Sequence, residues 1–210
     1  MKSLIISPEN ITAVILAGGL GRRMGGLDKG LQLIHGKPMV QHVMDRLQPQ
    51  VGKVLINANR HLDDYKGFGA PICSDSISGY AGPLAGIHAA LLQTDTPYLV
   101  TVPCDSPLLP NDLVSRLSVA VSEHQSDAAV VVTGNAEQQQ RHPVFLMLKS
   151  DLRSSLENYL NNGGRKVDDW LASLNCVNVP FEDETAFTNV NTPEDIQALI
   201  TTPGSRPAPG

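Results

Sequence analysis

The sequence predicts an α/β fold, a single doubly wound and mainly parallel sheet with helices on both faces. Short apolar runs of strand character alternate with segments whose apolar residues recur at helical spacing. The 210 residues contain no internal repeat and no change of composition typical of a linker. We therefore expect one domain over residues 11–200, between a flexible N-terminus (1–10) and a disordered tail (201–210) rich in Pro and Gly.

Five apolar runs read as buried strands, and two shorter ones are weaker candidates. In chain order the expected strands are 11–16, 54–58, 72–73, 98–102, 128–132, 144–148 and 177–179. Helical apolar stripes lie between or after them. The stripes comprise Met39, Val40, Val43, Met44 and Leu47; Leu84, Ile87 and Leu91; Leu113, Val114, Leu117 and Val121; Leu152, Leu156, Tyr159 and Leu160; and Ile196, Leu199 and Ile200. Pro38, Pro83 and Pro193 suit first turns, and Asn111 can cap the third helix.

Composition narrows the functional class. Hydrophobic content of 41% and charged content of 18% are those of an ordinary globular protein. A net charge of −5 argues against a general nucleic-acid or membrane-surface binder. The three cysteines show no zinc or disulfide spacing, which favours a reducing cytoplasm. No run approaches transmembrane length, and residues 4–6 are too short for the core of a signal peptide.

A glycine-rich loop after the first strand is the most informative segment. Six glycines fall within residues 18–30, together with Arg22, Arg23 and Lys29. Glycine lets the backbone turn tightly, and bare amides beside cations form an anion-binding concavity. The loop is not a P-loop, because Lys29 is followed by Gly30. It is not a dinucleotide fingerprint either, because Met24 stands where glycine is needed. We expect a ligand with several phosphates.

Polar residues follow the other predicted strands. Asp105, held between Pro103 and Pro107 at a strand end, is the candidate magnesium ligand, since magnesium takes one or two carboxylates plus substrate phosphates. Asn57 and Asp75 are candidates for reading a base, because a carboxylate can accept hydrogen bonds from N1–H and the exocyclic amine of guanine. Turn formation is an equally good explanation of either residue alone.

Several later segments carry cationic and amide groups suited to a second anionic substrate. These segments are 141–143, 162–166 and 189–194. Separately, a second glycine-rich stretch at 78–86 enters a helix. Residues 192–194 also form an ordinary helix start. His142 is a weak candidate base, because a phosphate nucleophile needs little proton abstraction.

The ordered set of motifs resembles a known family. Residues 16–19, 22–25, 28–29 and 36–38 resemble nucleotidyltransferases that join a nucleoside monophosphate to a phosphorylated acceptor. Residues 57–60, 82–86, 103–105 and 189–193 narrow the resemblance to the molybdenum cofactor guanylyltransferases, over about residues 11–200. It implies a Rossmann-like nucleotidyltransferase fold, the substrates GTP and molybdenum-molybdopterin, the cofactor Mg²⁺, and hand-over of the product to molybdenum cofactor insertion proteins and molybdoenzyme chaperones.

The resemblance also implies roles for individual residues. Carried over by position, the nucleotide contacts would be Leu16, Ala17, Gly18, Lys29, Asn57, Asp75 and Asp105. The residues of the glycine loop add Gly19, Gly21 and Arg22, whose amides and cation suit phosphate oxygens. Catalysis would rest on Lys29, Asp105 and Arg23, with Asp105 also on the metal, and Arg165, Asn189 and Asn191 would face the pterin. Lys166 departs from relatives with a second Arg, which weakens bidentate phosphate capture there. Two alternatives stay open: a cytidylyl or sugar-phosphate nucleotidyltransferase, and a GTP-binding module without chemistry.

Overall fold

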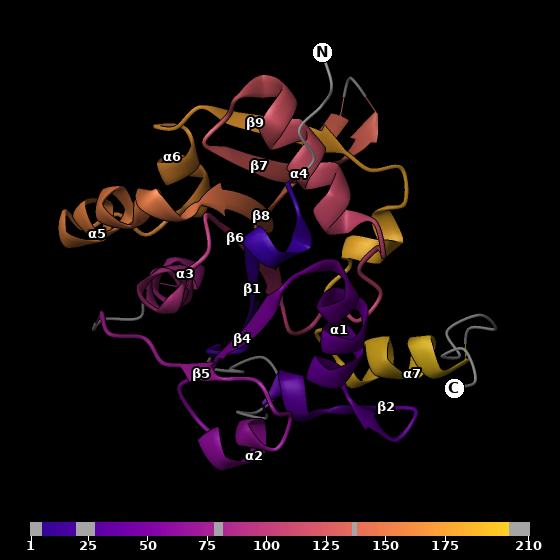
Figure 1. The fold of residues 1–210 in the computed structure, drawn as a ribbon. Coiled ribbons are helices and arrows are strands. Elements are labelled where there is room, and N and C mark those ends of the chain that lie inside the picture. Colours follow the sequence, from indigo (N-terminus) through magenta and orange to yellow (C-terminus); the bar gives the residue numbers. More distant parts are fainter. Residues whose placement is uncertain (1–5, 20–27, 78–81, 136–137, 202–210) are drawn as a thin grey trace.

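The computed structural model describes residues 6–19, 28–77, 82–135 and 138–201. A seven-stranded sheet in the order β5-β4-β1-β6-β8-β7-β9 forms its centre (Figure 1). The strands are β1 (Ile11–Leu16), β4 (Lys53–Asn57), β5 (Ile72–Cys73), β6 (Tyr98–Pro103), β7 (Ala128–Asn135), β8 (Gln138–Lys149) and β9 (Cys176–Pro180). Every run predicted as a strand is therefore present; 11–16 and 72–73 have the predicted bounds, and the ends of the other strands are shifted.

Both faces of the sheet are covered by helices, as the alternating pattern predicts. On one face, α1 (Met39–Leu47) and α4 (Leu113–His124) pack their apolar stripes on the sheet. On the other face lie α3 (Pro83–Gln93), α5 (Arg153–Asn161) and α6 (Val167–Leu171). Figure 1 shows these two groups on opposite sides of the strands. The doubly wound prediction is confirmed.

The sheet is parallel except around one strand. β5, β4, β1 and β6 run parallel, and β7 and β9 run parallel to each other. β8 is antiparallel to both of its neighbours, β6 and β7. The β7–β8 pair contains an irregularity after Val130, where the partner changes from Leu146 to His142. Pro143 lies in the skipped stretch, and proline cannot donate a ladder hydrogen bond.

Smaller elements complete the fold. A short hairpin of β2 (Leu33–Ile34) and β3 (Lys37–Pro38) precedes α1, and α2 (Leu62–Lys66) follows β4. The last helix, α7 (Pro193–Thr201), packs Ile196 and Leu199 against Ile34 and Met39. None of the helices in the described ranges has the length and apolar character to cross a bilayer.

Two predicted helix starts are wrong in detail. α4 begins at Leu113, so Asn111 is not its cap, and the residue at the N-cap position, Asp112, makes no capping side-chain bond. Instead Gln50 Oε1 accepts the amide of Val114 at 2.9 Å, satisfying one of the first-turn donors from another element. Pro38 precedes α1 rather than lying in its first turn, and Pro83 does begin α3.

Candidate active site

Four parallel strands end at one edge of the sheet. In the register, Leu16 at the end of β1 lies beside Asn57 of β4 and Pro103 of β6, and Asn57 lies beside Cys73 of β5. Ligands of open α/β sheets bind outside the carboxyl ends of the strands. The predicted site residues that follow these strands therefore share the edge where a ligand is expected.

Asn57, Asn59 and Asp75 form a connected group at this edge, called here the base cluster. Asn57, only 2% exposed, donates from Nδ2 to Asp75 Oδ1 at 2.9 Å and to the carbonyl oxygen of Cys73 at 3.2 Å. Asn59 Nδ2 donates to Asp75 Oδ2 at 2.8 Å, and Asn59 Oδ1 accepts the amide of Asp75 at 2.9 Å. The carboxylate of Asp75 is thus held on both oxygens.

The start of the glycine loop lies against the base cluster. The Ala17 amide donates to the Asn57 carbonyl at 2.8 Å, and Arg60 donates to the Gly19 carbonyl at 3.0 Å. A Cβ added to Gly18 would come within 2.6 Å of Asn59 Nδ2 and 2.9 Å of Asn57 Oδ1. A side chain at residue 18 would therefore displace the amide groups of Asn57 and Asn59 from their places in the cluster.

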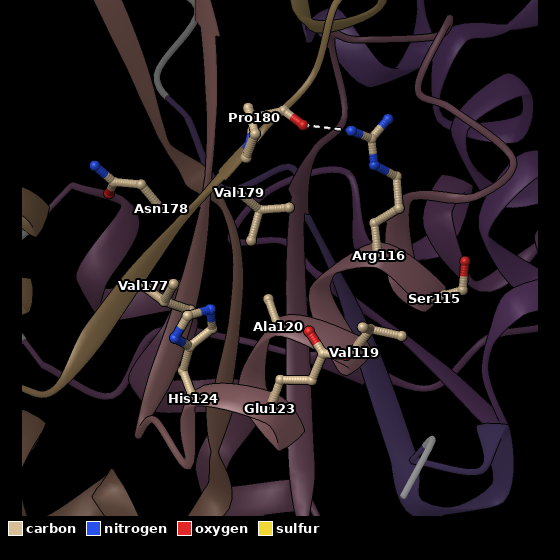
Figure 2. A pocket seen from close by; sticks show the side chains of 10 residues that line it. All are labelled: Ser115, Arg116, Val119, Ala120, Glu123, His124, Val177, Asn178, Val179 and Pro180. Atoms are coloured by element: carbon tan, nitrogen blue, oxygen red, sulfur yellow. Dashed lines mark hydrogen bonds between the residues drawn. The ribbon is translucent and has the colours of Figure 1, made fainter. Parts of the chain in front are cut away.

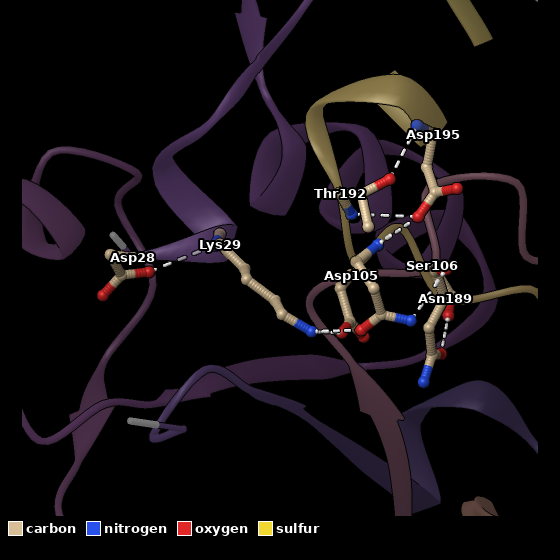
Figure 3. A network of polar contacts seen from close by, with 9 residues as sticks. Asp28, Lys29, Asp105, Ser106, Asn189, Thr192 and Asp195 are labelled. Carbon is tan, nitrogen blue, oxygen red and sulfur yellow. Dashed lines mark hydrogen bonds and ion pairs between the residues drawn. The ribbon is translucent and has the colours of Figure 1, made fainter. Parts of the chain in front are cut away.

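Lys29, Asp105 and Asn191 form a second group, called here the lysine cluster. Lys29 Nζ donates to Asp105 Oδ2 at 2.8 Å and to Asn191 Oδ1 at 2.5 Å. The Lys29 side chain is 21% exposed and that of Asp105 is 11% exposed. Figure 3 shows Lys29 extending from its one-turn 3₁₀ helix, η3 (Lys29–Leu31), toward Asp105. The cluster joins segments far apart in sequence, which a linear pattern does not reveal.

The chain before α7 is fastened to the lysine cluster. The amide of Val190 donates to the carbonyl of Asp105 at 2.8 Å, and Ser106 Oγ donates to Asn189 Oδ1 at 2.8 Å. Asn191 is oriented from behind, because its amide donates to Asp195 Oδ2 at 2.8 Å.

A reciprocal cap fixes the start of α7. The amide of Thr192 donates to Asp195 Oδ2 at 2.9 Å, while Thr192 Oγ1 accepts the amide of Asp195 at 3.1 Å (Figure 3). These backbone hydrogen bonds lower the pKa of the Asp195 carboxyl, the one from Asn191 most. The ordinary helix start anticipated at 192–194 is present, and it also positions the asparagine that touches Lys29.

Not every predicted residue joins these clusters. Gly21, Arg22 and Arg23 lie outside the described residues. Arg165 is exposed in the loop between α5 and α6, where it donates to the carbonyls of Leu160 at 2.9 Å and Gly164 at 2.6 Å. Figure 1 places α5 and α7 on opposite flanks of the sheet. The pterin-side assignment of Arg165 therefore stays a prediction.

Sequence reasoning missed two members of the site. Asn59 belongs to the base cluster and Ser106 supports Asn189, yet neither was singled out as a site residue. Asn59 lies two residues after Asn57, the last residue of β4, and Ser106 directly follows Asp105, so closeness in sequence was the available signal. Cys104 is buried, and burial raises the pKa of its thiol, so it packs as a small apolar side chain and is not a reactive thiol.

Two other features are less suited to chemistry. His142 is half-buried, burial lowers its pKa, and its Nε2 lies 2.8 Å from Thr133 Oγ1. A groove of about 350 Å³ between α4 and β9 (Figure 2) is lined by residues such as Arg116, His124 and Val179. It includes none of the residues predicted for the site.

Comparison with known proteins agrees with this geometry. Residues 13–177 match the family model of the MobA-like NTP transferase domain. A molybdenum cofactor guanylyltransferase of Cupriavidus metallidurans is 50% identical, over 91% of this chain and 95% of the relative. One from Shewanella loihica is also 50% identical, over 92% of this chain and 97% of that protein.

Solved structures show the same fold. The molybdopterin-guanine dinucleotide biosynthesis protein A of Archaeoglobus fulgidus superposes with a TM-score of 0.71 at 25% identity, covering 90% of this chain and 95% of the other. A 4-diphosphocytidyl-2C-methyl-D-erythritol synthase of Anaerococcus prevotii superposes with a TM-score of 0.75 at 13% identity, over 93% of this chain and 96% of the other, which supports the fold alone. On this evidence the chain is a nucleotidyltransferase that belongs to the molybdenum cofactor guanylyltransferase family.

Proposed function

We propose that the enzyme transfers GMP from GTP to molybdenum-molybdopterin, forming the guanine dinucleotide cofactor and releasing pyrophosphate. The observation that carries the proposal is the placement of the two clusters. The base cluster follows β4 and β5, Asp105 of the lysine cluster follows β6, and only β1 lies between β4 and β6. Adjacent strands are about 4.8 Å apart, so one extended nucleotide can reach both.

The base cluster is suited to guanine. Asp75 is an acceptor for the N1–H and exocyclic amine of guanine, and Asn57 buttresses it. Adenine presents an acceptor at N1, so a carboxylate oxygen that faces it would lack a donor and would be repelled by the N1 lone pair. The main chain at Leu16, Ala17, Gly18 and Gly19 would line the nucleotide between base and phosphates, and Gly21, Arg22 and Arg23 would continue toward the leaving pyrophosphate.

A divalent ion fits beside Asp105. Magnesium is usually held by one or two carboxylates and completes its shell with water and substrate phosphates. Asp105 provides a carboxylate at the ligand-facing edge, and the described residues contain no group of three His, Cys, Asp or Glu that could form a closed protein site. We therefore propose that Mg²⁺ binds through Asp105, where it would neutralise charge on the triphosphate.

The chemistry we propose is an in-line displacement. An oxygen of the terminal phosphate of molybdopterin forms a bond to the α-phosphorus of GTP, and the bond to the β-phosphate oxygen breaks, so pyrophosphate leaves. Lys29, already held in the cluster by Asp105 and Asn191, would stabilise the negative charge at the reacting phosphate. The remaining contribution is alignment of the two substrates, without a covalent enzyme intermediate.

The acceptor would approach from the side of Asn189 and Asn191, where Asn191 Oδ1 accepts a hydrogen bond from Lys29, with Arg165 as a more distant contact. The product would pass to insertion proteins and molybdoenzyme chaperones. We place the reaction in the cytoplasm, since Cys73, Cys104 and Cys176 are free thiols.

Asp105→Ala tests the proposal. We expect guanylyl transfer to fall by at least about 10²-fold, the loss typical of removing one preorganised electrostatic group, while the fold survives. Formation of guanine dinucleotide and pyrophosphate from GTP, Mg²⁺ and molybdopterin measures it, and circular dichroism checks folding. Asp95→Ala, which removes an exposed carboxylate paired with Lys53, is the matched control.

Three outcomes contradict the proposal in different ways. Normal transfer by Asp105→Ala removes that residue from its role. Turnover of wild type with CTP or a sugar phosphate in place of GTP or the pterin favours the related nucleotidyltransferase. Tight GTP binding without pyrophosphate release favours the binding module.

A further inference from the structure

Behind Lys29 lies a buried pair of hydrogen bonds that the proposed reaction does not use. Tyr65, on α2, is fully buried, and its hydroxyl donates to Asp28 Oδ1 at 2.6 Å. The same carboxylate oxygen accepts the amide of Gly30 at 3.1 Å. Asp28 is only 8% exposed, so this oxygen relies on protein donors rather than water.

These contacts hold the backbone on both sides of Lys29. Asp28 caps η3 through the Gly30 amide, and its own carbonyl accepts Gln32 Nε2 at 3.1 Å. Figure 3 shows the side chains of Asp28 and Lys29 leaving the turn in opposite directions, one away from the lysine cluster and one into it. Fixing the position of Asp28 therefore also fixes the backbone from which the Lys29 side chain extends.

Gly30 shows how closely Tyr65 approaches the turn. A Cβ added to Gly30 would overlap the Tyr65 hydroxyl, whereas the next atoms, Tyr65 Cζ and Cys104 Cβ, lie at 3.4 and 3.5 Å. The backbone of Gly30 is not in the left-handed region, so its lack of a side chain is explained by the hydroxyl and not by its dihedral angles. The Tyr65 hydroxyl can occupy its place beside the turn because residue 30 has no side chain.

We propose that Tyr65 is a positioning residue that acts through Asp28 to aim Lys29 at the triphosphate. The inference rests on the proposed function, which assigns Lys29 to the phosphates. Tyr65 suits the task because burial raises the pKa of its phenol, which keeps the hydroxyl protonated and donating at any pH at which the enzyme works. Phe at this position would keep the ring packing and remove only the donor.

The test is a double-mutant cycle read out by GTP affinity. Calorimetric titration with GTP and Mg²⁺, without acceptor, gives the dissociation constants of wild type, Tyr65→Phe, Lys29→Ala and the double variant. We expect Tyr65→Phe to weaken binding about fivefold in the presence of Lys29, within the usual coupling between linked residues. In the Lys29→Ala background it should have no further effect. Tyr98→Phe, at the opposite end of β6, should bind GTP like wild type.

The outcomes separate the two proposals. An equal loss of affinity from Tyr65→Phe in both backgrounds, or no loss in either, overturns the positioning role even if wild type makes the guanine dinucleotide. Absence of guanylyl transfer by wild type, or full GTP affinity in Lys29→Ala, overturns instead the task given to Lys29. A general loss of structure would weaken binding regardless of residue 29, so the cycle distinguishes it.

Gly30→Ala provides an independent check of the contact. In the wild-type background the new methyl group displaces the Tyr65 hydroxyl, so GTP affinity should fall at least as far as in Tyr65→Phe. In the Tyr65→Phe background the same methyl group meets only ordinary contacts and should cost less than twofold. Equal losses in the two backgrounds would contradict the arrangement.

Discussion

At the scale of single residues, Asp75 shows how a side chain can be prepared for a ligand. Both of its oxygens already accept amide hydrogens, from Asn57 and Asn59, while its own amide donates back to Asn59. A carboxylate has about four lone-pair sites, so two remain for a base. The neighbours fix the orientation of the acceptors before the nucleotide arrives.

Asp75→Asn should therefore remove guanine selectivity. The new amide group would face the donors of Asn57, Asn59 and guanine, and a hydrogen bond to a charged group contributes about 1.5–3 kcal/mol. We expect GTP affinity to fall about 10- to 100-fold and the preference for GTP over ITP, which lacks the exocyclic amine, to disappear. Competition binding measures both, with Asp95→Asn as the control; a retained preference would assign guanine recognition elsewhere.

His142 packs beside the segment that leads into the site, and we expect it to affect the stability of the fold and not to transfer a proton. Its ring lies 5.3 Å from that of Phe187 and 6.3 Å from that of Phe145, measured between centroids. Phe187 ends the 3₁₀ turn that leads into Asn189 and Asn191. Burial disfavours the charged imidazole and lowers its pKa, while Glu184 opposes the shift.

This shift predicts a pH dependence whose sign can be worked out. Because the folded-state pKa is below the ordinary 6.5, the unfolded chain binds the proton first as the pH falls. The free energy of unfolding should therefore decrease from about pH 7 downward, until the pH passes below the folded-state pKa. His142→Gln, which can keep a hydrogen bond to Thr133, should flatten that decrease. Urea titrations at several pH values measure it, and identical slopes in both proteins would refute the assignment.

At the scale of elements, the spacing of apolar residues correctly predicted the strands and the longer helices, whose formation depends on local sequence. The strands of the sheet and the helices α1, α3, α4, α5 and α7 follow from alternating apolar runs and stripes. The hairpin β2–β3 and the short helices α2 and α6 have two to five residues each, too few to show a period. The lysine cluster and the cap of α4 by Gln50 depend on contacts between distant segments, which no local pattern encodes.

Helix α3 carries a constraint that opposes its own helix propensity. A Cβ on Gly86 would lie 2.8 Å from Asn57 Cγ and 2.8 Å from Leu16 Cδ2. Helix propensity alone would make Gly86→Ala stabilising by about 0.5–1 kcal/mol, but overpacking typically costs about 1–3 kcal/mol. We expect the variant to be less stable in denaturant titrations and to bind GTP more weakly, because Asn57 must move. A stabilised variant with full affinity would show that the helix shifts freely.

At the scale of the whole molecule, β8 is the one strand of the seven-stranded sheet that runs opposite to the others. The parallel strands β5, β4, β1 and β6 present their ends to the nucleotide, and β8 reverses the direction beyond β6. The parallel part was predictable from strands alternating with helices. The direction of β8 was not, although adjacent strands 128–132 and 144–148 with no helix between them, and Pro143 at the irregularity, were available signals.

A ligand that bridges both clusters should stabilise the entire fold, and this linkage gives the broadest prediction. GTP with Mg²⁺ at about a hundred times its dissociation constant adds about 2.7 kcal/mol to the free energy of unfolding. For a chain of this size each kcal/mol raises the melting temperature by about 2–4 °C, so we expect a rise of roughly 5–11 °C. Because the base cluster selects guanine and the lysine cluster binds phosphate, ATP at the same concentration should shift wild type far less. Asp75→Asn should reduce the GTP shift to that of ATP, and Lys29→Ala should reduce both. Differential scanning calorimetry measures these shifts; equal stabilisation of wild type by GTP and ATP would mean that the two clusters do not share one nucleotide.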